Sequence, residues 1–416
     1  MTADWQDKTW GDIATLEYGK GLREYSGTSG QFPVFGTNGQ IGWYKEALYE
    51  GPSVIVGRKG AYRGIQYSET PFFVIDTAFY LKPKITFDMK WAYYELLTRD
   101  INSMDSGSAI PSTNRDEFHS LHVRIPPLPE QRRIALILGT LDDKIENNRK
   151  TAKTLEAMAQ AIFKSWFVDF DPVRAKMSGE SRESIRKRLK VTPEILDLFP
   201  DRLVDSELGE IPEGWGVGVF GNLVDYLHDQ ENPFSYPEVT FHHFSIPAFD
   251  EGKVPKVELG NAIKSLKLLV PPNVVLLSKL NPETNRVWLV DVAKGNRAVC
   301  STEFLVLRAK PPFTRSYIYL FAHSDFFREK IEGLVTGTSK SHQRAQAGSV
   351  SSIPAMLPAA NVIDVFNSIT DKMLLRTLIY RRELTDLIKI RDTLLPKLIS
   401  GEIRVPEADH LIEQAT

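Results

Sequence analysis

Apolar residues recur at alternating steps of four and three along residues 130–167, behind an abrupt start at Pro126, Pro127 and Pro129. This heptad spacing predicts a helix that packs along another helix, and a polar seam residue, Asn148, is typical of one that fixes register. Such a helix would be about 57 Å long. The predicted seam comprises Ile134, Leu138, Leu141, Ile145, Asn148, Ala152, Leu155, Ala159, Ile162 and Trp166.

A second seam follows when 228 is added to each of these positions. The same shift aligns Ile125-Pro126 with Ile353-Pro354, and Asp143-Lys144 with Asp371-Lys372. Because two unrelated amphipathic helices would not share these features, we predict an internal duplication whose two helices pair antiparallel about a pseudo-two-fold axis. The second seam comprises Val362, Phe366, Ile369, Met373, Arg376, Tyr380, Glu383, Leu387, Ile390 and Leu394.

Apolar positions outside the seam exceed what one helix pair can bury. We expect them to form further faces for partner subunits, which would leave the isolated chain poorly soluble. These positions are Ile137, Phe163, Phe167, Leu374, Leu378 and Ile388.

The rest of the chain alternates short apolar runs with glycine-rich turns, as in a domain of mixed strands and helices. Residues 53–56 form a buried-strand candidate, and their counterpart lies at residues 274–275 at a shift of 220. Trp5 corresponds to Trp215 at a shift of 210, so the second copy contains insertions. The predicted fold class is therefore α/β (α+β), with two globular domains separated by two long antiparallel coiled-coil helices.

The predicted order has six parts. The first globular domain covers residues 1–124, the first long helix 125–170, a connector 171–214, the second globular domain 215–353, the second long helix 354–400 and a C-terminal tail 401–416. The connector is charged and helix-prone, and we interpret its basic run Arg186-Lys187-Arg188 as a solvated helix face.

Composition adds limits to this picture. A chain of 416 residues with 42% hydrophobic and 25% charged residues is typical of a globular protein with more than one domain. The single cysteine, Cys300, fits a reducing compartment and is expected to be buried in a strand. No long apolar stretch or signal-peptide core is present, which predicts a cytoplasmic protein without a membrane span. The net charge of -2 argues against a stand-alone nucleic-acid binder, whose domain is usually basic, but it leaves open local basic grooves or a binder that acts inside a larger assembly.

Four segments resemble catalytic or metal-binding motifs, but each lacks a residue that the motif requires. The segment 333–340 lacks the lysine directly after its second glycine that a phosphate-binding loop requires. Lys310-Pro311-Pro312-Phe313 places a lysine where a base methyltransferase needs an acceptor. His242-His243 has no spaced metal-ligand partners, and Asp250-Glu251-Gly252-Lys253 is half of a nuclease carboxylate motif. We therefore predict no catalytic, cofactor-binding or metal site on this chain.

Polar loops at matching places in the two copies favour recognition of nucleic acid instead. Arg, Asn, Gln and Lys contact base edges, whereas Ser, Thr and backbone N–H groups hold phosphates. The candidates in the first copy are Arg58, Lys59, Tyr62, Arg63, Asn114 and Arg115. Those in the second copy are Lys279, Asn285, Arg286, Lys340, His342, Gln343 and Arg344.

Several motifs resemble the specificity subunit of type I restriction-modification enzymes over essentially the whole chain. They are Pro-Leu-Pro-Glu-Gln-Arg-Arg-Ile-Ala at 127–135, Leu-Asp-Asp-Lys-Ile at 141–145, Ala-Ile-Phe-Lys-Ser-Trp-Phe-Val-Asp-Phe at 161–170, Glu-Leu-Gly-Glu-Ile-Pro-Glu-Gly-Trp at 207–215 and Leu-Leu-Pro-Lys-Leu-Ile-Ser-Gly-Glu-Ile at 394–403. The second helix opens Leu-Pro-Ala-Ala-Asn at 357–361, without the Pro-Glu-Gln of the first.

The resemblance implies a non-catalytic subunit with two target-recognition domains and two spacer helices, which binds a bipartite, asymmetric site on double-stranded DNA. It also implies two methyltransferase (modification) subunits and restriction/translocase subunits as partners. S-adenosylmethionine, ATP and Mg are then expected on those partners. Two alternatives remain open, namely a scaffold that has lost DNA reading and a self-contained DNA-modifying enzyme with degenerate motifs.

Overall fold

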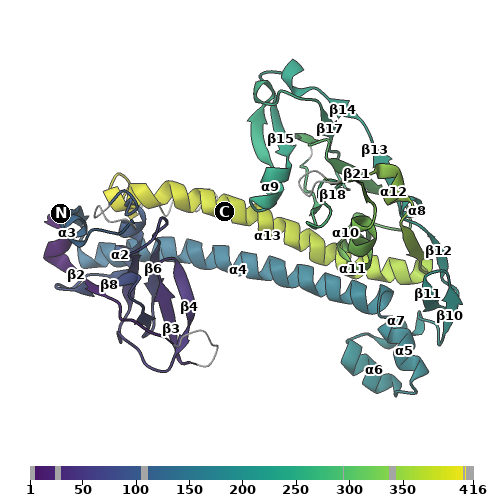
Figure 1. The fold of residues 1–416 in the computed structure, drawn as a ribbon, viewed down its shortest axis with the longest axis horizontal. Coiled ribbons are helices and arrows are strands. Elements are labelled where there is room, and N and C mark those ends of the chain that lie inside the picture. Colours follow the sequence, from purple (N-terminus) through teal and green to yellow (C-terminus); the bar gives the residue numbers. More distant parts are fainter. Residues whose placement is uncertain are drawn as a thin grey trace. The chain divides into compact units, whose positions relative to one another are not determined.

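The computed structural model describes residues 5–23, 30–104, 111–293, 295–336, 343–405 and 408. The chain divides into two compact units. Unit 1 comprises Met1–Asn148 and Glu383–Thr416, and unit 2 comprises Arg149–Arg382. Each unit contains strands, short helices and part of both long helices, α4 (Leu128–Phe167) and α13 (Ala360–Ser400) (Figure 1).

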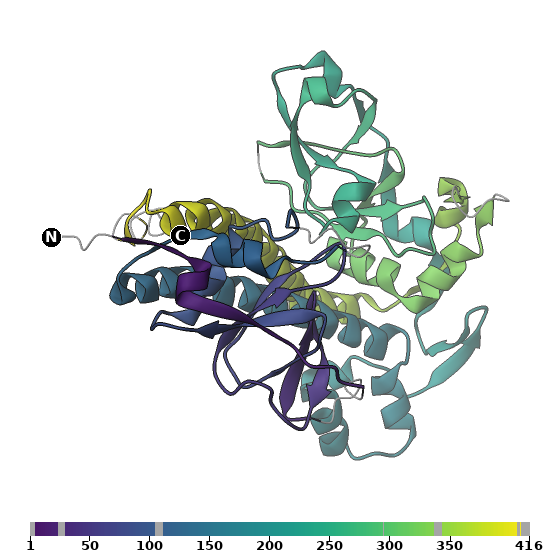
Figure 2. The same ribbon diagram turned by 60° about the vertical axis from the view of Figure 1, so that its left-hand side comes forward.

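The strands of unit 1, which are purple and blue in Figure 2, include an antiparallel sheet. Its strand order is β2-β8-β5-β6. Its strands are β2 (Ala14–Tyr18), β8 (Ala78–Pro83), β5 (Ser53–Gly57) and β6 (Ile65–Ser68). A small sheet has the order β4-β3-β7, from β4 (Gly39–Tyr44), β3 (Phe32–Gly36) and β7 (Phe73–Val74). The remaining elements are the antiparallel pair β1 (Gln6–Thr9) and β9 (His122–Ile125), and the helices α1 (Trp10–Ile13), α2 (Met89–Leu97) and α3 (Arg115–Ser120).

The core of unit 1 is aromatic. Trp10, Trp91, Tyr94 and Phe118 are almost fully buried. The Trp10 indole donates to the Glu95 carboxylate at 3.0 Å, and Arg99 forms an ion pair with the same carboxylate. A buried charge is tolerated only with such partners, so this group is satisfied inside the core.

Unit 2 repeats this plan with insertions. Its antiparallel sheet has the order β13-β21-β18-β19, from β13 (Val224–Leu227), β21 (Phe304–Ala309), β18 (Val274–Ser278) and β19 (Val287–Leu289). The small sheet grows to five strands, in the order β14 (Gln230–Glu231), β17 (Lys267–Leu269), β20 (Arg297–Cys300), β15 (Thr240–Phe244) and β16 (Lys256–Leu259). Cys300 is buried in β20, as predicted, and burial raises the pKa of its thiol to about 12.

Shorter elements complete unit 2. The strand pairs are β12 (Gly216–Val219) with β24 (Pro354–Leu357) and β22 (Val335–Thr336) with β23 (Arg344–Ala345). The helices are α8 (Phe220–Leu223), α9 (Ile246–Asp250), α10 (Arg315–His323), α11 (Asp325–Glu332) and α12 (Ala347–Ser351), with 3-10 turns at Pro233–Ser235 and Gly260–Ala262.

Equivalent hydrogen bonds establish the register of the duplication. Gly57 N–H donates to the Gly64 carbonyl, and Ser278 N–H donates likewise to Arg286, so the central strands differ by 221 residues and not 220. Ile125 pairs with Gln6, the first residue of β1, and Leu357 pairs with Gly216, the first residue of β12. The strands that precede the two long helices are therefore related by a shift of 232 residues and not 228. The predicted shift was wrong because seams built on steps of three and four nearly superpose after a slip of four residues.

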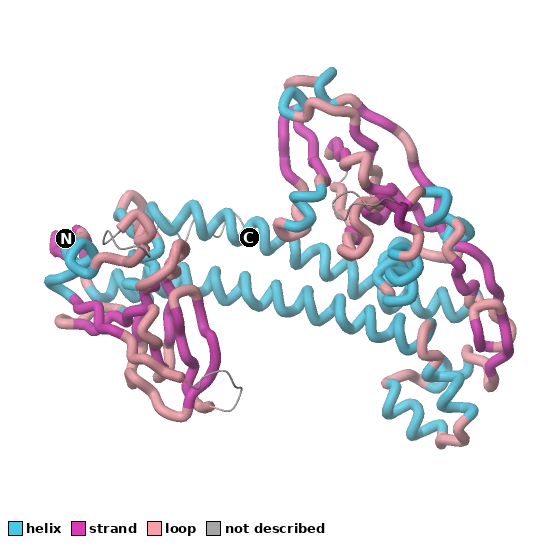
Figure 3. The backbone as a smooth tube through the Cα atoms, viewed as in Figure 1, coloured by secondary structure: helices cyan, strands magenta, loops and turns pink. Residues whose placement is uncertain are grey.

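The long helices are antiparallel within each unit, as predicted (Figure 3). In unit 1, Asn148 donates to the Glu383 carboxylate at 2.9 Å, and Asp142 pairs with Arg391 at 3.0 Å. In unit 2, Glu156 pairs with Arg381 at 2.6 Å. The second helix begins at Ala360, however, because residues 354–357 form strand β24 rather than the helix that we expected from residue 354 onward.

The apolar positions outside the seam are covered by the chain itself, which corrects the expectation that they face partner subunits. Phe163, Phe167, Leu374 and Leu378 are buried in the core of unit 2. Ile137 is buried in the core of unit 1, and Ile388 packs against that core. Each unit therefore covers these six positions itself, although other apolar side chains of the long helices, such as Leu136 and Leu375, remain exposed.

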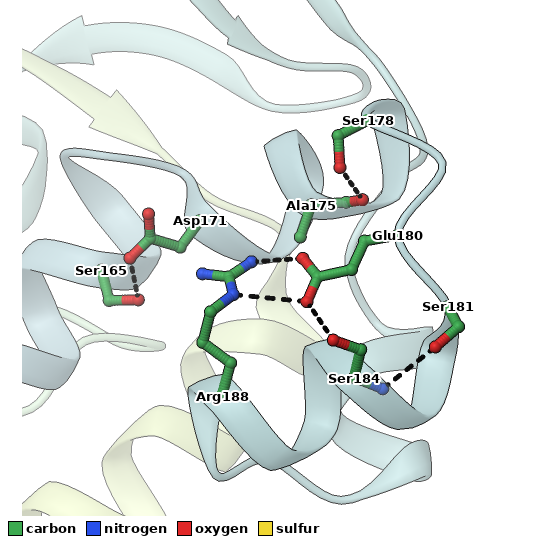
Figure 4. A network of polar contacts seen from close by, with 8 residues as sticks. All are labelled: Ser165, Asp171, Ala175, Ser178, Glu180, Ser181, Ser184 and Arg188. Atoms are coloured by element: carbon green, nitrogen blue, oxygen red, sulfur yellow. Dashed lines mark hydrogen bonds and ion pairs between the residues drawn. The ribbon is translucent and has the colours of Figure 1, made fainter.

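The predicted connector is part of unit 2 and not an independent linker. It forms α5 (Asp171–Met177), α6 (Arg182–Leu189), α7 (Pro193–Asp197) and the hairpin of β10 (Leu203–Ser206) and β11 (Gly209–Pro212). Its apolar residues Ile185, Leu196 and Phe199 join the unit 2 core. The basic run on α6 is exposed, as predicted, and Arg188 pairs with Glu180 at 2.7 Å (Figure 4).

Candidate DNA interface

In unit 1, loops that are distant in sequence meet at the end of the central strand β5. Lys59 forms an antiparallel bridge with Ser112, and Gly60 N–H donates to the Pro111 carbonyl at 2.9 Å. The Thr113 hydroxyl donates to the Gly57 carbonyl at 2.8 Å. The two polar loops predicted from the sequence thus form one surface, which we call loop cluster 1 (residues 57–64 and 111–115).

Two arginines of loop cluster 1 contact the same tyrosine ring. The guanidinium carbon of Arg58 lies 4.8 Å from the centroid of the Tyr18 ring, and that of Arg115 lies 5.3 Å from it. The Tyr18 side chain is 47% exposed at the end of β2, so the contact remains open to solvent. A cation over an aromatic face is attracted by the ring quadrupole without using its N–H donors. Arg58 donates one of these to the Asp76 carbonyl at 3.0 Å, and its other donors remain available.

Arg63 has a structural position. It is only 3% exposed, and its guanidinium donates to the carbonyls of Ile101, Asn102 and Met104 at 3.1, 2.8 and 2.8 Å. Because these donors are already used inside the fold, Arg63 is not available to contact DNA in the way that the sequence suggested. Its hydrogen bonds instead fix the loop that presents Arg58 and Lys59.

The other predicted residues of unit 1 fall into two groups. Tyr62 is 80% exposed and Lys59 pairs with the exposed Asp76 at 3.4 Å, so both side chains remain accessible. Asn114 caps α3 by accepting from the N–H groups of Asp116 and Glu117, so its side-chain oxygen is occupied. Asn114 therefore orients α3 and places Arg115 beside Tyr18.

Unit 2 brings its predicted loops together in the equivalent way. Leu280 forms an antiparallel bridge with Arg344, and Asn281 N–H donates to the Gln343 carbonyl at 2.8 Å. Ala345 N–H donates to the Lys279 carbonyl, as Thr113 N–H does to Arg58. We call this surface loop cluster 2 (residues 278–286 and 343–346).

The arginines of loop cluster 2 are held by carboxylates. Arg286 donates two hydrogen bonds to Asp250 at 2.8 and 2.9 Å. Arg344 donates two to Glu303 at 3.0 and 2.7 Å. Such bidentate pairs fix the plane of the guanidinium and use part of its donor capacity.

The remaining predicted residues of unit 2 differ from one another in burial and in their contacts. Lys279 and Gln343 are half-buried, and the Asn285 amide lies 3.3 Å from the His323 ring. Burial lowers the pKa of His323 to about 4, so this ring is neutral near pH 7. Lys340 and His342 lie outside the described residues.

The near-catalytic motifs have structural partners. Asp250 of the half nuclease motif pairs with Arg286. The His243 ring lies 2.7 Å from the Glu258 carboxylate, and desolvation lowers the pKa of this histidine. Within the described ranges, no group of three His, Cys, Asp or Glu residues could hold a metal ion, and no helix there is long and apolar enough to cross a membrane.

Sequence reasoning missed two residues of this surface. Tyr18 lies about forty residues before the loop that it supports, and the signal for it was an aromatic residue at a strand end before Gly19. Asp250 was considered only for catalysis. Its contact with Arg286 joins elements whose proximity the chain order does not reveal.

The two units thus share one scaffold, and each presents cationic and amide side chains from two loops that meet at the end of its central strand. The family model described as the type I restriction modification DNA specificity domain matches residues 2–157. The chain is 26% identical over 345 residues to the type I restriction enzyme HindI specificity subunit of Haemophilus influenzae. This alignment covers 70% of this chain and 71% of that protein.

Two further relatives agree. The type I restriction enzyme MjaIX specificity subunit of Methanocaldococcus jannaschii is 22% identical over 338 residues, covering 78% of this chain and 71% of that protein. The crystal structure of the type I restriction-modification S subunit of M. genitalium has the same fold, with a TM-score of 0.65, 14% identity and coverage of 95% of this chain and 96% of that chain. The family model and these relatives thus agree with the resemblance that the sequence motifs indicated: residues 2–157 match the specificity domain, and specificity subunits of type I restriction enzymes align with 70–78% of the chain.

Proposed function

We propose that this chain is the non-catalytic subunit that recognises DNA sequence for a type I restriction-modification complex. The observation that supports this most strongly is the pair of loop clusters at equivalent ends of β5 and β18. Both present arginine and lysine beside amide side chains, the types that contact base edges and phosphates. The clusters differ in nearly every side chain, so the two half-sites should have different sequences.

The contact residues in this proposal are Arg58, Lys59, Tyr62 and Arg115 of loop cluster 1. Asn114 acts as the cap that positions Arg115. In loop cluster 2 they are Lys279, Asn285, Arg286, Gln343 and Arg344, together with Lys340 and His342 from the sequence. The target is then double-stranded DNA with two unlike half-sites.

The partners in this proposal are two methyltransferase subunits and the restriction/translocase subunits, in the cytoplasm. S-adenosylmethionine, ATP and Mg would bind to those partners, with no cofactor on this chain. The internal duplication supports a pair of like partners, because two equivalent scaffolds offer two equivalent environments.

The test uses the chain assembled with its methyltransferase subunits and methylation sequencing of host DNA. We expect Arg58→Ala or Lys59→Ala to affect the first half-site only, and Arg344→Ala or Lys340→Ala the second only. Loss of a bidentate base contact should cost about 1–3 kcal/mol and relax one position. Loss of a phosphate contact should weaken binding on every sequence and reduce its salt dependence.

A matched control is Arg186→Ala on α6, which removes an exposed arginine far in sequence from either loop cluster. Its methylation pattern should equal that of the wild type. Unchanged patterns in all four loop variants would contradict the proposed surface. Turnover of DNA by the purified chain with Mg²⁺ and labelled S-adenosylmethionine would instead favour a self-contained enzyme, and absence of DNA binding with partners present would favour a scaffold.

A further inference from the structure

The turn between β3 and β4 lies against loop cluster 1. Gly64 N–H donates to the Thr37 carbonyl at 2.9 Å, and the Gln66 amide lies 3.4 Å from the same oxygen. A Cβ atom at Gly57 would lie 2.6 Å from that carbonyl, so glycine permits the close approach. This turn is therefore held in place by the loop that presents Arg58.

The turn presents an amide with free hydrogen-bonding groups. Asn38 is exposed, and its side chain has no hydrogen-bond partner among the described residues. Gln40, also exposed, donates to the Gly42 carbonyl at 3.3 Å, so its amide is partly used. Gly39 at the tip has a φ of +145°, which lets the chain turn sharply beneath Asn38.

The same region of unit 2 has a different construction. Phe35 and Phe244 are equivalent, since their carbonyls accept from Ile75 N–H and Ser301 N–H. The segment after Phe244 contains helix α9, and its Asp250 binds Arg286 of loop cluster 2. At this place unit 2 presents a carboxylate that is already paired, whereas unit 1 presents an unpaired amide.

We propose that the β3–β4 turn is a further specificity-determining segment of unit 1, and that Asn38 contacts an adenine of the first half-site. This inference rests on the proposed function. An asparagine amide matches the adjacent acceptor and donor of adenine in the major groove. The hydrogen bonds to the Thr37 carbonyl hold the backbone that carries Asn38 at a defined place relative to the loop of Arg58, which a base-specific contact needs.

The experiment uses the full chain assembled with its methyltransferase subunits and determines the methylated sequence in host DNA. For Asn38→Ala, we expect preference for adenine to be lost at one position of the first half-site, with affinity for the original site reduced about 5- to 150-fold. The second half-site should be unchanged. Asn38→Arg should shift the preference at that position toward guanine, since arginine pairs with guanine edges.

The matched control is Gln31→Ala, which removes an exposed amide just before β3, at the opposite end of this strand. It should leave both half-sites unchanged. Wild-type base preference in both Asn38 variants would overturn the inference, and so would equal weakening on every sequence, because that result indicates a phosphate contact. The proposed function would fail separately if the wild-type complex methylated no defined sequence.

Discussion

The two loop clusters occupy equivalent places but hold their cations differently. In unit 1, the guanidinium carbons of Arg58 and Arg115 lie over the Tyr18 ring, at 4.8 and 5.3 Å from its centroid. In unit 2, Arg286 and Arg344 form bidentate pairs with Asp250 and Glu303. One arrangement orients the cation with a neutral ring, and the other neutralises it with a carboxylate.

This difference has consequences for DNA binding. A stacked guanidinium does not use its in-plane donors on the ring, so Arg58 keeps those that the Asp76 carbonyl does not take for a base edge or a phosphate. A paired guanidinium must share its donors, and its carboxylate repels an approaching phosphate. We therefore expect unit 1 to contribute more of the affinity for DNA. In unit 2, the carboxylates should restrict the directions from which a DNA acceptor can approach the two arginines.

The units also differ in how a short helix, α2 in unit 1 and α10 in unit 2, is bonded through a tyrosine to the long helices. In unit 1, the Tyr94 hydroxyl donates to Asp142 at 2.7 Å, and Asp142 pairs with Arg391. In unit 2, Tyr319 donates to Glu156, which pairs with Arg381, and His323 lies beside Tyr319 with ring centroids 4.7 Å apart. Unit 2 thus adds a buried histidine at this place, whereas the Tyr94, Asp142 and Arg391 contacts of unit 1 include none.

The largest expected effect concerns Arg63. Arg63→Met removes the donors to three carbonyls, and unsatisfied buried groups should lower the free energy of unfolding of unit 1 by on the order of 3 kcal/mol. Asn285 precedes Arg286 in unit 2 as Arg63 precedes the equivalent Gly64 in unit 1, and Asn285→Ala should cost only about 1 kcal/mol. Hydrogen exchange of peptides from each unit measures both. Equal losses in the two units would show that Arg63 is not the main support of its loop.

The next effect is the response of unit 2 to acid. The folded state lowers the pKa of His323 from 6.5 to about 4 by burial, with Lys253 adding to this and Glu156 opposing it. Between these values the unfolded state binds more protons, so stability should fall as pH decreases from about 6.5 to 4, by at most about 1.4 kcal/mol per pH unit.

Urea unfolding at pH 7 and pH 5 checks this expectation. His323→Gln should reduce the pH dependence, whereas His122→Gln, which alters an exposed histidine of unit 1, should leave it unchanged. A variant without His323 that retained the full dependence would assign the effect to other groups.

The stacked arginines of unit 1 predict an intermediate effect. Tyr18→Ala should weaken binding to the first half-site by about 1–2 kcal/mol, because Arg58 and Arg115 lose the ring that orients them. Tyr18→Phe keeps the ring and should bind nearly as the wild type does. Fluorescence titrations with DNA measure both, and a similar loss in the two variants would indicate that the hydroxyl, not the ring, is required.

The smallest effect should come from the carboxylates of unit 2. Glu303→Gln or Asp250→Asn should change the free energy of unfolding by less than about 1 kcal/mol, since the pairs are partly exposed. Removing the negative charge should tighten DNA binding a few-fold and steepen its salt dependence. The corresponding variant in unit 1 is Asp76→Asn, which removes the carboxylate that pairs with Lys59. Weaker binding in the unit 2 variants would mean that the carboxylates position their arginines productively.

The sequence by itself determined the long helices, their antiparallel pairing within each unit and the duplication. These follow from local periodicity, because heptad spacing and prolines act over a few residues. It also identified both pairs of loops that meet at the ends of β5 and β18, since equivalent strands must place equivalent loops at equivalent ends. The motifs at 127–135 and 161–170 were sufficient to indicate the family.

Tertiary structure alone decided the register and the use of each side chain. A shift of 228 was as periodic as the true 232, and only pairings such as Ile125 with Gln6 and Leu357 with Gly216 distinguish them. Arg63 and Arg58 are both arginines of one loop, yet one is buried among carbonyls and the other stacks on Tyr18. Burial and partner choice depend on residues far away in the chain, so no local pattern specifies them.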